Sequence, residues 1–134
     1  MSASKENFVL HKLILIGAAG GVGALARYGL AGVVQRASGG MFPWGTVAVN
    51  CLGCFAAGFL WTLAEERLSL SSEARACVFV GFIGAFTTFS TYILETGRMF
   101  REGEWLWAAG NMTLQNAAGV ALLFIGIAAA RAVA

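Results

Sequence analysis

The sequence contains very little charge and no aspartate. Charged residues make up 12% of its 134 residues, whereas an ordinary soluble domain contains about 25%. Hydrophobic residues make up 58%, and the mean hydropathy is +0.74. These values exclude a water-soluble surface and predict a single-domain membrane protein.

Other residue types are also scarce. The nine Lys and Arg residues are scattered along the chain, which excludes a nucleic-acid-binding surface. His11 is the only histidine and lies at a predicted membrane edge, so a membrane enzyme is not expected. Cys51 and Cys54 form a C-x-x-C motif without a second pair or a histidine cluster, and we interpret them as buried small side chains.

Four segments are long and apolar enough to cross a bilayer, which requires about 20 residues. They cover approximately residues 13–34, 44–63, 74–100 and 105–130. The first follows a short polar start without a cleavage site, so it is expected to be an anchor and not a removed signal peptide. Gly17 and Gly21 have the small-xxx-small spacing that favours helix packing.

Acidic residues are missing from the predicted membrane interior. All seven glutamates lie in connectors or near predicted helix ends: Glu6, Glu65, Glu66, Glu73, Glu95, Glu102 and Glu104. Cation pathways and proton-coupled transporters usually need an intramembrane carboxylate. The sequence therefore argues against both classes.

Neutral hydrogen-bond donors are present there instead. They are Asn50 in the second segment, Thr113, Gln115 and Asn116 in the fourth, and Thr87, Thr88, Ser90, Thr91 and Tyr92 in the third. Amides and hydroxyls can donate hydrogen bonds to a desolvated anion. They can also bond to one another and hold helices together. Their concentration without any acid favours an anion route.

The third segment contains "GFIGAFTTFSTY", with Gly81 and Gly84 followed by clustered hydroxyls. Glycine is costly in a helix interior, and Ser and Thr compete for backbone groups. A helix broken near its middle is one interpretation. A straight helix whose hydroxyls bond to the preceding turn is the other.

Basic residues are almost balanced between the two membrane sides. Five lie on the side of the termini (Lys5, Lys12, Arg67, Arg75 and Arg131) and three on the other (Arg36, Arg98 and Arg101), with Arg27 inside or near the end of the first segment. Such a slight excess allows one chain to insert both ways up, although a single topology stays open. Four short helices can scarcely enclose a polar route alone, so an oligomer is expected, most simply a C2 dimer. Arg27 either snorkels to the interface or sets a positive potential near an anion vestibule.

Three stretches in order across the chain resemble the Fluc (CrcB) family of small fluoride channels. They are "GALARY" (23–28), "PWGTVAVNCLG" (43–53) and "GFIGAFTTFSTY" (81–92). The resemblance implies an all-α membrane protein with four transmembrane helices per subunit. It also implies an antiparallel dual-topology homodimer, two fluoride pores, and export of toxic fluoride across the bacterial inner membrane.

The resemblance also implies roles for residues. A structural sodium ion would be held by the main-chain carbonyls of Gly84 and Thr87 from both subunits. The pore residues would be Asn50, Phe89, Ser90, Thr91, Tyr92, Thr113 and Gln115. Three positions depart from the family pattern: Tyr92 stands where some members have Phe, Gln115 stands where relatives often have Ser, and Gly119, one turn further, offers no side chain.

Two other functions compete with passive fluoride conduction. A small transporter of the multidrug type also has four spans and dual topology, but it needs an acid in the first helix, where this sequence has none. A non-transporting assembly subunit would explain the packing glycines but not the donors.

Overall fold

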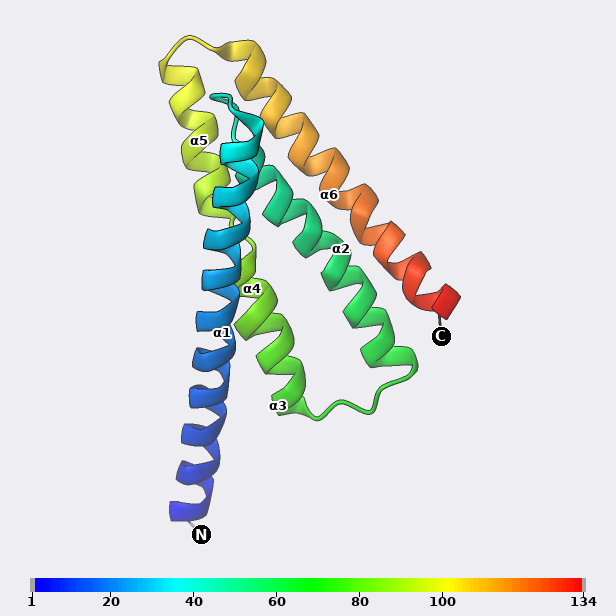
Figure 1. Ribbon diagram of the computed structural model, residues 1–134. Helices are drawn as coiled ribbons and strands as arrows, with labels where there is room; N and C mark the ends of the chain where they lie inside the picture. Colours follow the sequence, from blue (N-terminus) through cyan, green and yellow to red (C-terminus); the bar gives the residue numbers. More distant parts are fainter. Residues whose placement is uncertain (1, 134) are drawn as a thin grey trace.

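The computed structural model describes residues 2–133, and side chains from Asn7 onward. Every regular element in this range is helical (Figure 1). Four helical segments are long and apolar enough to cross a membrane: Asn7–Ser38, Trp44–Glu66, Ser72–Arg101 and Trp105–Val133. The prediction of an all-helical membrane protein with four spans is therefore confirmed at this level.

The first helix, α1, runs Ser2–Ser38, well beyond the predicted 13–34. Its 37 residues correspond to about 55 Å at 1.5 Å per residue. A bilayer core is about 30 Å thick. In Figure 1 its N-terminal part reaches past the ends of the other helices. The sequence prediction covered only the apolar part, because polar residues at an exposed end do not stop a helix.

The second and last helices, α2 (Trp44–Glu66) and α6 (Trp105–Val133), pack closely against each other. Glycines allow this approach. A Cβ atom on Gly58 would collide with the Leu123 carbonyl, and one on Gly126 would collide with the Phe55 carbonyl.

Glycines also bring α1 close to the third span. A Cβ atom on Gly23 would collide with the carbonyl of Phe82. Gly17 and Gly21, which the spacing predicted to pack, have no neighbouring atom within 4 Å of the position that a Cβ atom would take. Among the described residues, no other helix of the same chain covers this side of α1, so the packing predicted from the spacing is not found within one chain.

The third span consists of several pieces in sequence. They are α3 (Ser72–Arg75), the π-helix η1 (Ala76–Ile83), α4 (Gly84–Phe86) and α5 (Phe89–Arg101). Ser71 caps α3, since its hydroxyl accepts a hydrogen bond from the Ala74 N–H at 3.2 Å. The π-helix was not expected from the sequence. Such helices are rare and often occur at functional sites.

Two residues between α4 and α5 have extended backbone conformations. Thr87 has φ −87° and ψ 160°, and Thr88 has φ −149° and ψ 113°. The chain therefore leaves the helix after Phe86 and enters a new one at Phe89. Thr88 caps the new helix, because its hydroxyl accepts from the Thr91 N–H at 3.2 Å.

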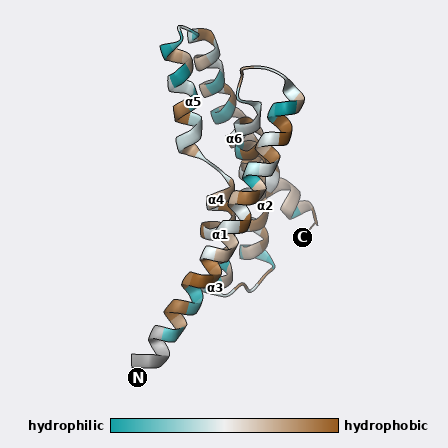
Figure 2. Cartoon of the chain, turned by 60° about the vertical axis from the view of Figure 1, so that its left-hand side comes forward, coloured by the Kyte–Doolittle hydropathy of each residue, from teal (hydrophilic) through white to brown (hydrophobic). Residues whose placement is uncertain are grey.

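The outer surface is apolar. Large side chains such as Leu25, Val80 and Leu106 are exposed, the last by 86%. Figure 2 shows hydrophobic residues along the helices and strongly hydrophilic ones near the α5–α6 turn. In Figure 1, α1 begins and α6 ends away from the α5–α6 turn, as an even number of spans requires. This surface suits a lipid environment.

The glycine contact between α2 and α6 can be tested by adding one methyl group. Gly126→Ala is expected to lower the free energy of unfolding by about 1–3 kcal/mol, because overpacking forces the two backbones apart. Thermal denaturation of the purified protein in detergent measures the effect. Gly110→Ala is the matched control on the same helix, where a Cβ atom would have no neighbour within 4 Å. Equal melting temperatures for both variants would contradict the packing described.

Candidate functional site

The side chain of Asn50 on α2 holds the extended residue Thr88 at both of its backbone polar groups. Asn50 Oδ1 accepts from the Thr88 N–H at 2.8 Å, and Asn50 Nδ2 donates to the Thr88 carbonyl at 3.0 Å. An amide side chain can make both bonds at once because it carries a donor and an acceptor side by side. At the interruption of the third span, the backbone N–H and carbonyl of Thr88 are thus hydrogen-bonded by a side chain of the neighbouring helix α2.

These bonds leave two carbonyls without their usual helical donors. The Thr88 N–H is directed to Asn50 and the Thr91 N–H to the Thr88 hydroxyl. Neither closes the helical bond to the carbonyl four residues earlier, which belongs to Gly84 and Thr87 respectively. The Thr87 carbonyl instead accepts a long hydrogen bond from Arg27 Nη1 at 3.4 Å.

A chain of amides extends from Asn50 into α6. Asn50 Nδ2 also donates to Gln115 Oε1 at 2.7 Å. Gln115 Nε2 donates to Asn111 Oδ1 at 3.0 Å, and Asn111 Nδ2 donates to the Thr96 hydroxyl at 2.9 Å. Gln115, Asn111 and Thr96 are all buried. The chain therefore connects the interruption at Thr88 with the body of α5 through side chains alone.

Two aromatic rings follow the interruption. The rings of Phe89 and Tyr92 have centroids 5.7 Å apart and planes inclined at 60°. Tyr92 is buried, whereas Phe89 is 74% exposed. The Tyr92 hydroxyl accepts from Asn116 Nδ2 at 3.0 Å. One ring is thus fixed by a polar contact and the other faces out of the chain.

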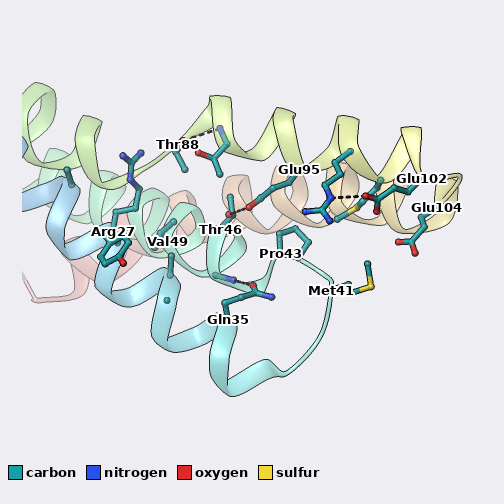
Figure 3. Close-up of a pocket in the computed structure, with 18 residues that line it drawn as sticks. Arg27, Gln35, Met41, Pro43, Thr46, Val49, Thr88, Glu95, Glu102 and Glu104 are labelled. Atoms are coloured by element: carbon teal, nitrogen blue, oxygen red, sulfur yellow. Dashed lines mark hydrogen bonds and ion pairs between the residues drawn. The ribbon is translucent and has the colours of Figure 1, made fainter.

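Two hollows lie beside Thr88, which lines both. The smaller, of about 320 Å³, has a lining that includes Asn50, Thr87, Thr88, Phe89, Tyr92, Gln115 and Asn116. The larger, of about 610 Å³, is drawn in Figure 3, and its lining includes Arg27, Thr46, Thr91 and Glu95.

Glu95 is a carboxylate inside the third span. It lies in the middle of α5, half-buried, and Oε1 accepts from the Thr46 hydroxyl at 2.8 Å (Figure 3). Its Oε2 is buried without a hydrogen-bond partner among the described residues. The expectation that every acid lies in a connector or near a helix end is therefore wrong for Glu95. Helix α5 continues through the polar residues after Ile93, so Glu95 lies within the helix and not at its end. Its side chain lines the larger hollow.

Sequence comparisons agree with this architecture. The sequence model of one protein family, described as "CrcB-like protein, Camphor Resistance (CrcB)", matches residues 14–127. This chain belongs to the CrcB family. The resemblance seen in the three sequence stretches is therefore confirmed.

Several relatives align over nearly the whole chain of this CrcB protein. A protein of Desulforapulum autotrophicum named fluoride-specific ion channel FluC is 54% identical over 121 residues, which cover 90% of this chain and 97% of the relative. Proteins with the same name from Nitrosococcus oceani and from Nitratidesulfovibrio vulgaris (strain Miyazaki F) are 50% and 48% identical. They cover 87% and 92% of this chain, and 93% and 100% of their own lengths. These relatives are named as channels and not as enzymes.

The structure of this CrcB protein brings some of the predicted pore residues together and separates others. Asn50, Phe89, Tyr92 and Gln115 line the smaller hollow, and Thr91 lines the larger one. Ser90 and Thr113 are exposed and line neither of these two hollows. The fold of one chain therefore does not group these two hydroxyls with Asn50.

Gln115 was predicted to donate hydrogen bonds to an anion, but its amide nitrogen is not directed toward Asn50. Its oxygen faces Asn50, and its nitrogen is bonded to Asn111. The sequence did not identify Asn111, Thr96 or Glu95 as site residues. Asn111 precedes Gln115 by four residues, so their positions on one helix face were available from the sequence. Nothing in the spacing pointed to Thr96 or to the pairing of Glu95 with Thr46.

The hold of Asn50 on Thr88 can be tested through stability. Asn50→Leu removes three hydrogen bonds and leaves the backbone of Thr88 unsatisfied, so the free energy of unfolding is expected to fall by about 2–4 kcal/mol. Thermal denaturation in detergent measures it. Asn7→Leu is the matched amide control and is expected to cost less than about 1 kcal/mol, because Asn7 is exposed on α1 and lies outside the site. An Asn50→Leu protein as stable as the control would show that the interruption does not depend on Asn50.

Proposed function

We propose that this protein is a passive, selective fluoride channel that exports toxic fluoride across the bacterial cytoplasmic membrane. The observation that carries the proposal is the smaller hollow, where neutral amides and aromatic rings gather around Asn50 in a four-span protein. Relatives about half identical over nearly full length are named fluoride-specific ion channels. An anion channel is the function that both observations support.

Fluoride is a small anion that accepts hydrogen bonds and cannot donate them. Amide N–H groups and hydroxyls can replace part of its water shell. The positive edges of Phe89 and Tyr92 can face the ion without placing a formal charge in its path. In this mechanism fluoride moves down its electrochemical gradient past Asn50, Thr91 and these ring edges. A narrow donor-lined passage fits a larger halide poorly.

The interruption at Thr87 and Thr88 is, in this proposal, the mid-membrane break of the third span. Backbone groups in a bilayer are tolerated outside a helix only where protein or a cavity satisfies them. The bonds from Asn50 supply that satisfaction here. The break would then place Phe89 and the hydroxyls of Thr88 and Thr91 beside the passage.

The working form is, we propose, an antiparallel dual-topology homodimer. Phe89 is 74% exposed in one chain, so a second chain is needed to enclose a passage along its ring. Gly17 and Gly21 lie on a side of α1 that no other described helix of the same chain covers, and a second copy can approach closely there. The nearly balanced basic residues suit insertion in both orientations.

A structural sodium ion between the two copies is part of this proposal. The Gly84 and Thr87 carbonyls lack their helical donors, and neutral oxygens of this kind are ligands for hard cations. The residues therefore fit the ion in donor type. Two chains would supply four such carbonyls, and the ion would join the two breaks.

A small transporter of the multidrug type is not favoured. The first span, Asn7–Ser38, contains no acidic residue for proton coupling. The relatives are named as channels.

Flux through reconstituted protein tests the proposed function. Liposomes that contain the protein should release fluoride, measured with a fluoride electrode, and retain chloride in the parallel experiment. Asn50→Asp should abolish fluoride release, because it places a negative charge where the anion needs a donor. Wild-type protein that releases no fluoride would contradict the proposal. Undiminished release by Asn50→Asp would remove Asn50 from the passage.

A further inference from the structure

In the chain of amides beside the smaller hollow, Thr96 determines which atom of each amide donates and which accepts. The Thr96 hydroxyl donates its one hydrogen to the Tyr92 carbonyl at 2.8 Å. It can therefore only accept from Asn111, whose Nδ2 lies 2.9 Å away. This contact turns the nitrogen of Asn111 toward α5 and its oxygen toward Gln115.

The orientation of Asn111 in turn determines the orientation of the Gln115 amide. Asn111 is completely buried at 0% exposure, and its oxygen accepts from Gln115 Nε2 at 3.0 Å. The Gln115 oxygen must then face the other way, toward α2. There it accepts from Asn50 Nδ2 at 2.7 Å, the shortest bond of the chain of amides. Asn111 thus determines which end of the Gln115 amide meets Asn50.

Asn50 has no uncommitted N–H in this arrangement. Its nitrogen carries two hydrogens, and these are directed to the Thr88 carbonyl and to Gln115 Oε1. An anion can receive a hydrogen bond from Asn50 only by replacing one of these acceptors. The Thr88 carbonyl belongs to backbone that Asn50 also holds through its oxygen. The Gln115 oxygen is the end of a side chain and is the replaceable acceptor.

We infer that Asn111 is a positioning residue for fluoride, acting through Gln115 on Asn50. By holding the Gln115 oxygen against Asn50, it makes that oxygen compete with fluoride for the Asn50 N–H. The competition weakens fluoride binding at Asn50 and favours the release of fluoride from Asn50. This inference rests on the proposed function.

The signature of this role is a change in the half-saturating fluoride concentration for release from liposomes. Asn111→Leu removes the acceptor that holds Gln115 Nε2, and the freed amide can turn its nitrogen toward the hollow. The half-saturating concentration is expected to fall by about threefold to tenfold, the effect of one hydrogen bond. Gln115→Met removes the competing oxygen and is expected to give a decrease of the same size.

The double variant separates a positioning role from a packing role. If Asn111 acts only through Gln115, Asn111→Leu combined with Gln115→Met should match Gln115→Met alone. A packing role would instead lower protein yield or maximal rate and leave the half-saturating concentration unchanged. Thr62→Val is the matched control. Thr62 is a buried hydroxyl on α2 that bonds to the Gly58 carbonyl and lines neither hollow, so its loss should leave that concentration unchanged.

Thr96→Val provides a second variant if Asn111→Leu does not fold. It removes the hydroxyl that orients Asn111 and should also lower the half-saturating concentration. A folded, conducting Asn111→Leu or Thr96→Val protein with the wild-type value would overturn the inference, as would independent effects in the double variant. Wild-type liposomes that release no fluoride would instead overturn the proposed function, and this inference with it.

Discussion

The hydrogen bonds between Asn50 and Thr88 are the contact on which the rest of the site depends. A transmembrane helix normally satisfies all of its backbone groups internally. Here two threonines are extended, and an amide from the neighbouring helix takes the place of the missing helical partners. Without that amide the interruption would expose unpaired N–H and carbonyl groups, each costly in an apolar medium. The direction of α5, and with it the placement of Phe89 and Tyr92, follows from this contact.

The charges near the site are arranged unevenly. Arg27 and Glu95 both line the larger hollow, whereas the described lining of the smaller hollow contains neutral residues only. A formal positive charge beside an anion would bind it strongly, and conduction requires binding weak enough for the ion to leave. Neutral amides provide donors without that penalty. Arg27 is bonded to the Thr87 carbonyl, so its charge lies beside the break and not within the chain of amides.

Much of the fold could be predicted from the sequence. Hydropathy gives the four spans because each needs a long apolar run. Asn50 and Gln115 could be selected because amides inside an apolar segment need hydrogen-bond partners. Phe89 and the ring of Tyr92 were candidates through the resemblance to the CrcB family. Ser90 and Thr113 were selected as hydroxyls and through the same resemblance, and the structure places both outside the two hollows. The π-helix η1 and the pairing of Thr46 with Glu95 depend on contacts between distant segments, which residue spacing does not contain.

The central claim is that an Asn50 amide held by Thr88 donates to fluoride. Nuclear magnetic resonance of protein with ¹⁵N-labelled asparagine side chains, in detergent or lipid, tests it most directly. The account predicts that fluoride shifts the Asn50 Nδ2 resonances, that equal concentrations of chloride do not, and that the resonances of Asn7 on α1 stay in place. Asn50 resonances that do not respond to fluoride, in protein shown to release it from liposomes, would contradict the account.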